Sequence, residues 1–347
     1  MSGKNQIASK STRLLVTGGA GFMGSAFVKH MTNKRNDVNA SAIYDVVVVD
    51  KLSYAGNKSN IAGIKNKFVK SDICNKTIVE KLVENSDIVV NYAAETHVDR
   101  SIKSGESFVK SNILGTFTLL EAARKFNKRL IQISSDEVYG SVNNGKFKET
   151  DSLQPNSPYA ASKASADLLV RSFIQTYGLD AKVVRSCNVF GHHQYPEKFI
   201  PRAITNLIEG KKIQLYGDGK NVREWIYVDD HASAVEFIIN NWEPTIGDRK
   251  SSFDNNNIIN IGTGNEKQNI EVARFILQEF GLDKSMIDFV KDRPGHDFRY
   301  AMDWRLLRSK GWKPNVNFNE ALSATIEWYK ENKKWWKPLV KKCPNTI

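Results

Sequence analysis

The chain has 347 residues, of which 41% are hydrophobic and 25% charged, so it is long enough to bury a large core or to form two packed lobes. Its longest β-branched run, residues 46–49, is too short to span a bilayer, and residues 1–12 contain no apolar segment, so we expect a cytoplasmic protein that does not enter the membrane. Cys74, Cys187 and Cys343 are few, odd in number and far apart, which argues against a disulfide framework and against a paired-cysteine metal site.

The net charge of +12 is concentrated at the two ends of the chain. Lys4, Lys10 and Arg13 lie at the start, and residues 326–347 carry six lysines against two glutamates, so the ends hold more than half of the excess. This distribution favours solvated basic ends, and we expect no nucleic-acid partner. A nucleoside-diphosphate substrate would also favour a basic cleft, which composition alone does not locate.

Short apolar runs alternate with longer helical patterns through the first half of the chain. The predicted strands are 13–17, 45–50, 66–70, 87–92, 129–134 and 181–186. The predicted helices between them are 22–33, 75–85, 106–126 and 158–178. This alternation predicts an α/β fold of the Rossmann type, a doubly wound parallel sheet with helices on both faces.

The alternation ends after Arg185, where glycine, asparagine and proline become more frequent. We therefore expect a smaller C-terminal α/β lobe that binds substrate, some of whose strands could return to the first sheet. The predicted parts are a flexible N-terminus (1–12), a dinucleotide-binding Rossmann domain (13–187), a substrate-binding lobe (188–330) and a basic C-terminal tail (331–347). Three tryptophans near this tail are interpreted as packing residues: Trp328, Trp335 and Trp336.

Residues 13–24, RLLVTGGAGFMG, place glycines between the first predicted strand and the first predicted helix. The spacing fits two dinucleotide-binding patterns, which share Gly21 and Gly24 and begin at Gly18 or Gly19. Glycine permits a tight turn and a close approach of the main chain to a pyrophosphate at a helix N-terminus. Asp50 ends the next strand, where its carboxylate would bind the ribose hydroxyls and repel a 2′-phosphate, so NAD is the predicted cofactor.

The helix predicted at 158–178 starts with Ser157 as N-cap and Pro158 in its first turn. Tyr159 and Lys163 stand four residues apart and therefore on one face. We expect the ammonium group to lower the pKa of the phenol, so that it can take a proton from a sugar hydroxyl.

Residues 134–140, SSDEVYG, follow the apolar run 130–133 and place two adjacent carboxylates at the end of a strand. Two carboxylates are costly to desolvate there. Parallel sheets bind ligands at the carboxyl ends of their strands, so this pair is a candidate site rather than a solvated loop.

Several motifs in this order and spacing resemble the extended short-chain dehydrogenase/reductase family: TGGAGFMG, NYAAETHVD, SNILGT, SSDEVYG and YAASK. Others look like the dTDP-glucose 4,6-dehydratases within that family: DKLSYAGN, YPEKFIP, NVREWIYVDDH and DRPGHDFRY. The resemblance covers about residues 13–330. It departs from the usual pattern at Ser135, where the family has threonine, and at His192, where it has proline.

The resemblance implies an NAD-dependent lyase that converts dTDP-glucose to dTDP-4-keto-6-deoxyglucose and water, in the synthesis of deoxysugar nucleotides. Glu137 is implied to be the base that removes the C5 proton, and Asp136 the acid that protonates the C6 hydroxyl. Tyr159, Lys163 and a positioning hydroxyl on Ser135 are implied to serve the hydride transfers. Besides Tyr159 and Lys163, the implied cofactor contacts are Gly18, Gly21, Phe22, Met23, Gly24, Asp50, Lys51, Asp72, Ile73, Ala93 and Ala94.

The second lobe and one earlier motif supply the implied substrate contacts, which are His97, Asn188, Glu197, Lys198, Arg223, Asn260, Arg293 and His296. Arg223 and Lys198 suit a diphosphate, arginine through its fork and lysine as a point charge. For His97, a structural hydrogen bond is an equally good interpretation. The family also implies a homodimer, with helices 106–126 and 158–178 forming a bundle; the stripe of Leu168, Leu169, Phe173 and Ile174 fits this, or packing on the sheet.

Other functions stay open on the sequence. A UDP-glucose 4,6-dehydratase would share the catalytic motifs. A sugar-nucleotide 4-epimerase would share the glycine turn and the Tyr159 and Lys163 pair, but it has no use for acid and base at C5 and C6. A dinucleotide-binding scaffold without activity is the non-enzymatic alternative.

Overall fold

The structure, a computed structural model, describes residues 11–33, 44–64, 66–242 and 257–343. Residues 1–10 of the predicted flexible N-terminus and residues 344–347 of the predicted basic tail therefore lie outside the described residues.

Within these ranges, seven parallel strands form the central sheet in the order β10-β6-β5-β4-β1-β2-β3. They are β1 (Thr12–Thr17), β2 (Tyr44–Asp50), β3 (Lys67–Lys70), β4 (Ile88–Asn91), β5 (Arg129–Ser135), β6 (Ala181–Ser186) and β10 (Ile258–Ile261). Most central strand residues are buried, as expected for a parallel sheet covered on both faces. The order from β3 to β6 is that of the Rossmann fold, so the predicted fold class is confirmed.

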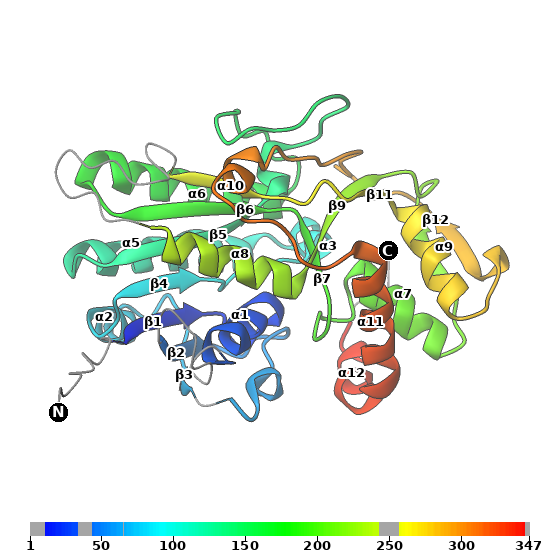
Figure 1. Cartoon of the computed structure of the whole chain (residues 1–347), viewed down its shortest axis with the longest axis horizontal. Helices are drawn as coiled ribbons and strands as arrows, with labels where there is room; N and C mark the ends of the chain where they lie inside the picture. Colours follow the sequence, from blue (N-terminus) through cyan, green and yellow to red (C-terminus); the bar gives the residue numbers. More distant parts are fainter. Residues whose placement is uncertain (1–10, 34–43, 65, 243–256, 344–347) are drawn as a thin grey trace, which may run out of the picture.

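Helices cover both faces of the sheet (Figure 1). One face carries α1 (Phe22–Asn33) and α8 (Val228–Asn240), which lie side by side, with the short η2 (Lys58–Ile61) near α1. The other face carries α2 (Lys76–Glu84), α5 (Gly115–Lys125) and α6 (Pro158–Tyr177). The loop after β4 contains α3 (Val98–Lys103), and β5 continues into the single turn η4 (Asp136–Tyr139).

The predicted helix 106–126 is not regular. It begins as α4 (Glu106–Phe108), widens into the π-helix η3 (Val109–Leu114) and continues as α5. The wide turn directs Asn112 inward, where its amide bonds the main chain of Glu95 in both directions and the hydroxyl of Ser162. Apolar periodicity does not reveal such a turn, because the outer residues keep a helical pattern.

The second half of the chain builds a C-terminal lobe on a core of its own. Its strands form a three-stranded sheet, β11-β9-β7, and a pair, β12-β8, among the described residues. The strands are β7 (Asn188–Phe190), β8 (Ile213–Tyr216), β9 (Val222–Tyr227), β11 (Glu266–Gln268) and β12 (Ile287–Val290). The helices are α7 (Phe199–Ile208), α9 (Asn269–Glu279), η5 (Lys284–Met286), α10 (Arg305–Ser309), α11 (Phe318–Glu331) and α12 (Lys333–Val340).

The chain crosses between the two parts more than once. After β9 it returns to place α8 and β10 in the Rossmann layer, and β10 pairs with β6. The end of the chain is also structured: Trp336 of α12 is fully buried in the core of the C-terminal lobe. The exact domain boundaries stay a prediction, but α12 shows that much of the basic tail is a packed helix.

Candidate active site

The glycine turn between β1 and α1 is packed too closely for side chains. Gly18 has a φ of +65°, and a Cβ atom there would lie 2.6 Å from the Ala93 nitrogen. A Cβ atom on Gly24 would lie 2.3 Å from the Gly18 carbonyl oxygen. Gly21 lines a cavity, and a Cβ atom there would approach only the same oxygen, at 3.2 Å. The main chain at the N-terminus of α1 can therefore come close to a phosphate group.

Asp50 lies beside this turn at the end of β2. Its carboxylate accepts hydrogen bonds from the N–H groups of Ala20 (3.0 Å) and Leu52 (2.7 Å). Burial raises the pKa of Asp50, and these hydrogen bonds lower it. Each carboxylate oxygen can accept more than one hydrogen bond, so Asp50 can hold the turn and still bind a ribose diol.

The turn and Asp50 open onto a first cavity, with an empty volume of about 1170 Å³ that includes its mouth. All thirteen residues predicted to contact the cofactor line it: Gly18, Gly21, Phe22, Met23, Gly24, Asp50, Lys51, Asp72, Ile73, Ala93, Ala94, Tyr159 and Lys163. Lys51 donates a hydrogen bond to Ser111 (2.7 Å) and lies 3.4 Å from the carboxylate of Glu95. The donor set, the glycine turn and the size of the cavity fit NAD.

The carboxyl pair lies where β5 ends. Ser135 caps the turn η4: its hydroxyl accepts from the Glu137 N–H (3.3 Å) and donates to Asp136 Oδ1 (3.1 Å). Asn188 approaches the other Asp136 oxygen at 3.5 Å. A second cavity is lined by Ser135, Asp136 and Glu137, so one bound ligand could contact all three residues.

Burial raises the pKa of both carboxyl groups, but their neighbours differ. The pKa of Asp136 lies well above its ordinary value because of burial and the adjacent charge of Glu137. The pKa of Glu137 is raised by burial and lowered by Arg293, Lys198 and Arg223. Asp136 is therefore favoured as the protonated partner and Glu137 as the ionised one.

The helix α6 carries Tyr159 and Lys163 at its buried start. The Ser157 hydroxyl accepts from the Ala160 N–H at 3.1 Å, as an N-cap does, and the Tyr159 N–H donates to the Ser101 hydroxyl at 3.1 Å. Lys163 donates to the Ile133 carbonyl at 2.5 Å. Tyr159 lines both cavities, so it stands where they meet.

The expected lowering of the Tyr159 pKa is wrong for this structure. Burial is the largest cause and raises that pKa; the nearby charge of Glu137 raises it further, and the Ser135 hydroxyl opposes the shift. Burial also lowers the pKa of Lys163 to about 8. Sequence spacing places the two side chains on one face, but it carries no information about how strongly that face is desolvated.

The second cavity adjoins the first and has an empty volume of about 1580 Å³, its mouth included. It is lined by seven of the eight predicted substrate residues: His97, Asn188, Glu197, Lys198, Arg223, Arg293 and His296. Residues that line both cavities are Met23, Thr96, Ser134, Tyr159, Gln194, Glu197 and Lys198. A ligand in one cavity would therefore reach a ligand in the other beside Tyr159.

The basic residues of this cavity are held by the protein in different ways. Lys198 donates to the Thr96 carbonyl at 2.6 Å, and Arg293 donates to Asp99 Oδ1 at 3.1 Å. Arg293 Nε is buried without a hydrogen-bond partner among the described residues, so it can serve a ligand. Arg223 already donates to the carbonyl groups of Val222, Asp297 and Phe298, which leaves part of its fork for a diphosphate.

Asn260 lies apart from the other predicted substrate residues, so its contact with substrate stays a prediction. Asn260 is fully buried in β10 and lines neither of these two cavities. Its Oδ1 accepts from the Tyr139 hydroxyl (2.9 Å), and its Nδ2 donates to the carbonyl groups of Phe147 and Asp303. The amide joins the sheet to the loop that covers it.

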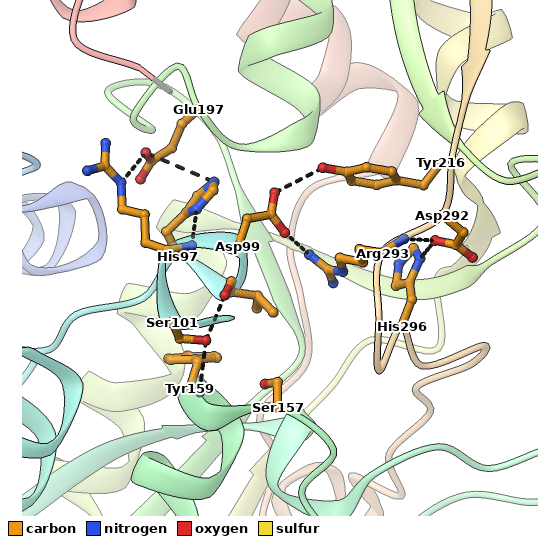
Figure 2. Close-up of polar contacts among 12 residues, drawn as sticks. His97, Asp99, Ser101, Ser157, Tyr159, Glu197, Tyr216, Asp292, Arg293 and His296 are labelled. Carbon is orange, nitrogen blue, oxygen red and sulfur yellow. Dashed lines mark hydrogen bonds and ion pairs between the residues drawn. The ribbon is translucent and has the colours of Figure 1, made fainter. Parts of the chain in front are cut away.

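Figure 2 shows a polar network at the second cavity, in which Asp99, Ser101 and Tyr216 were not predicted as site residues from the sequence. Asp99 of α3 binds Arg293 and accepts from the Tyr216 hydroxyl at 2.9 Å. Two residues further along α3, Ser101 binds the main chain of Tyr159. The motif NYAAETHVD, which ends in Asp99, was the available signal, because polar side chains in the segment after a parallel strand lie at the edge of the sheet that binds ligands.

His97 and Glu197 lie on the same side of this network. The Nδ1 atom of His97 accepts from the Arg100 N–H (3.3 Å), and burial lowers the pKa of His97 to about 3. The neutral ring then carries its proton on Nε2, 4.0 Å from Glu197. Glu197 itself accepts from Arg100 Nε at 2.9 Å.

The loop with the unusual His192 is stabilised by side chains. His192 Nε2 lies 3.3 Å from Asp229, and its Nδ1 lies 3.0 Å from the ring of His193. His193 adopts a φ of 62°, in the left-handed region. This loop leads into Gln194, which lines both cavities.

Among the described residues, neither a metal site nor a membrane-spanning helix is found. In that part of the chain, no group of at least three histidine, cysteine, aspartate or glutamate residues is arranged to hold a metal ion. No described helix combines the length and the apolar character needed to cross a bilayer.

Known proteins resemble the chain over nearly its whole length. The family described as GDP-mannose 4,6 dehydratase matches residues 15–325. A "dTDP-glucose 4,6-dehydratase" of Streptomyces niveus is 44% identical over 94% of this chain and 95% of its own. The "Low-salt glycan biosynthesis protein Agl12" of Haloferax volcanii is 44% identical over 91% of this chain and 98% of its own.

A solved structure resembles it equally well. The dTDP-glucose 4,6-dehydratase DesIV from Streptomyces venezuelae, solved with NAD and TYD bound, superposes with a TM-score of 0.86 at 43% identity, over 94% of this chain and 100% of that one. These matches confirm the resemblance seen in the motifs. The chain belongs to the GDP-mannose 4,6 dehydratase family, and within it to the group of the dTDP-glucose 4,6-dehydratases.

Proposed function

We propose that this protein converts dTDP-glucose to dTDP-4-keto-6-deoxyglucose and water, with NAD held in the first cavity and the sugar nucleotide in the second. One observation carries the proposal: Asp136 and Glu137 face the second cavity beside Tyr159, where the two cavities meet. The names of the relatives and the ligands of DesIV support it. Bound NAD would take a hydride from C4 of the sugar and return one to C6.

The acid and the base for the elimination are assigned by charge. Glu137, with Arg293, Lys198 and Arg223 as its positive neighbours, removes the C5 proton once C4 is a ketone and returns a proton to C5 when C6 receives its hydride. Asp136, whose pKa lies well above its ordinary value, gives a proton to the C6 oxygen, which leaves as water. Epimerisation at C4 needs no such pair at C5 and C6, so this pair favours the dehydratase.

The remaining catalytic groups act in the oxidation at C4 of the sugar. Tyr159 takes the proton of the C4 hydroxyl, and Ser135 positions that hydroxyl. Lys163, held by the Ile133 carbonyl, lines the cofactor cavity on the same helix as Tyr159. Because burial and the nearby charge of Glu137 raise the pKa of Tyr159, the phenol needs a positive charge beside it to give up its proton, and we assign that role to Lys163.

We also propose a homodimer formed through α5, η3 and α6. These helices expose several large apolar side chains. The exposed fractions are 53% for Leu168, 41% for Phe117 and 54% for Tyr177, and Val109 and Leu114 of η3 are exposed as well. Phe173 of the predicted stripe instead packs on the sheet, so the stripe divides between the two surfaces.

We place the enzyme in the reducing cytoplasm, which suits its free cysteines, Cys74, Cys187 and Cys343.

The test of the function is a comparison of kcat/KM for dTDP-glucose and UDP-glucose. We expect dehydration of both, with dTDP-glucose preferred: its thymine methyl group can supply roughly 10- to 200-fold, and UDP-glucose differs from it also by a 2′-hydroxyl group. A preference for UDP-glucose would assign the second candidate, a UDP-glucose 4,6-dehydratase. NAD binding without turnover of either sugar would leave only the dinucleotide-binding scaffold.

A further inference from the structure

The last two helices of the chain reach back to the cofactor cavity. Trp336 is buried in the core of the C-terminal lobe, and the neighbouring Trp335 packs against the edge of that core while its indole also reaches the Rossmann domain. Its indole N–H donates a hydrogen bond of 2.9 Å to Oδ1 of Asn60. Asn60 belongs to η2, shortly after the loop 51–57 that follows β2. The basic, tryptophan-containing tail therefore has a specific partner in the other half of the molecule.

Asn60 connects Trp335 to the glycine turn through a second hydrogen bond. It is 1% exposed, and its Nδ2 donates to the carbonyl oxygen of Ala20 at 3.0 Å. Ala20 lies between Gly19 and Gly21, and its own N–H donates to Asp50 at 3.0 Å. Consecutive hydrogen bonds thus join Trp335 to the turn and to Asp50, which are the groups placed to hold the pyrophosphate and the ribose of NAD.

The same helices hold a second loop. The Tyr329 hydroxyl of α11 donates to the Gln194 carbonyl, and the ring of His193 lies 4.5 Å from Trp328 and 5.3 Å from Trp335, measured between centroids. Gln194 and the next residue, Tyr195, line the first cavity.

The two loops meet over that cavity. Tyr54, from the loop 51–57, and Tyr195 contact each other edge to face with ring centroids 5.3 Å apart, and both line the cofactor cavity. A cofactor leaving on this side would have to separate these rings. The helix pair α11 and α12 binds one loop through Asn60 and the other through Gln194, so it opposes their separation.

We propose that α11 and α12 act as a clasp on the cofactor cavity, and that Trp335 is a positioning residue that slows the release of NAD. This inference rests on the proposed function, because a hydride taken from C4 can return to C6 of the same sugar only while the cofactor stays bound. A purely structural Trp335 would change the stability of the fold and leave the release of NAD unaltered.

The variant Trp335→Phe tests the clasp, since it keeps an aromatic ring and removes the N–H donor. The full-length protein is loaded with radiolabelled NAD and chased with unlabelled NAD. We expect the label to leave roughly 2- to 10-fold faster than from the wild type, the range for losing one hydrogen bond, with kcat at saturating NAD unchanged. Trp312→Phe is the matched control, because its indole N–H also donates a buried hydrogen bond, to Ser233, away from both cavities.

A double variant tests the connection through Asn60. If Trp335 acts through this residue, Trp335→Phe combined with Asn60→Ala should release NAD no faster than Asn60→Ala alone. Additive effects would overturn the connection, and a wild-type release rate in Trp335→Phe would overturn the clasp. A wild-type protein that retains no NAD and dehydrates no sugar nucleotide would refute the proposed function, which is a distinguishable result.

Discussion

Two carboxyl groups that are adjacent in the chain, one buried and one half-buried, become different through their neighbours. Asp136 receives hydrogen bonds from Ser135 and Asn188, whereas Glu137 faces the positive charges of Arg293, Lys198 and Arg223. The roles of acid and base follow from these contacts, and substitutions that keep the size of each side chain can separate them.

Replacing the base should stop the reaction after oxidation. In Glu137→Gln, the elimination step should slow by about 10²- to 10⁴-fold, the usual scale for a general base, because the amide cannot take the C5 proton. The measurements are the rate of water loss and the exchange of solvent deuterium into C5. Glu149→Gln is the matched control, since Glu149 also has a pKa raised by burial but lines neither cavity. Dehydration near the wild-type rate in Glu137→Gln would refute the assignment.

Replacing the acid should have a different effect. Asp136→Asn should leave the exchange of deuterium into C5 largely intact and slow the loss of the C6 oxygen, because the amide cannot donate an acidic proton. Comparing C5 exchange with product formation in the same sample separates the two steps. Loss of C5 exchange in this variant would mean that Asp136 and Glu137 do not divide the work as assigned.

The pH profile should respond to Arg293. Glu137 must be ionised to act, and its pKa is raised by burial, so kcat should fall as the pH drops through a value above the ordinary glutamate pKa. Arg293 lowers that pKa, so Arg293→Gln should move the acid limb of the kcat profile to higher pH, and Arg293→Lys should restore most of it. Arg299→Gln, which removes a partner of Glu266 outside the second cavity, should leave the limb in place.

At the scale of elements, the helix α6 serves two surfaces. Its first turn carries Tyr159 into the site, and its outward face exposes Leu168 and Tyr177. The π-helix η3 is divided in the same way, with Ser111 bonded to Lys51 in the cofactor cavity and Val109 exposed outside. An interface on this face would therefore lie one helix thickness from the cofactor.

The proposed dimer can be broken at this face. Leu168→Glu replaces an exposed apolar side chain of α6 by a charge, so sedimentation should show a monomer where the wild type is a dimer. Phe289→Glu is the matched control, because Phe289 is equally exposed, at 58%, but lies on β12 of the C-terminal lobe. A monomeric wild type, or an unchanged Leu168→Glu dimer, would contradict the proposal.

At the scale of the whole molecule, the fold brings the two cavities together at Tyr159. We therefore expect that deuterium placed on C4 of dTDP-glucose appears on C6 of the same product molecule. The measurement is mass spectrometry of a reaction that contains two substrates. One is dTDP-glucose with deuterium on C4, and the other is dTDP-glucose with heavy carbon in its sugar and no deuterium. Transfer of deuterium to the heavy-carbon product would show that the cofactor leaves between the two steps.

Local patterns in the sequence were sufficient for the Rossmann sheet, the glycine turn, Asp50 and the start of α6. These features depend on neighbours in the chain: a glycine that no side chain can replace, an N-cap serine, an apolar run that ends in polar residues. The motifs also singled out seven residues that line the second cavity, and their contact with substrate stays a prediction; Asn260 of β10 lines neither cavity.

Contacts between distant segments decided the rest. Asn260 became structural because Tyr139, Phe147 and Asp303 occupy its amide, and the Tyr159 pKa rises because several elements bury the ring together. Trp335 meets Asn60 across 275 positions of sequence, so its basic surroundings gave no sign of a role at the cofactor cavity. Burial and hydrogen-bond partners are properties of the packed chain, which is why spacing and composition could identify the chemistry but not these contacts.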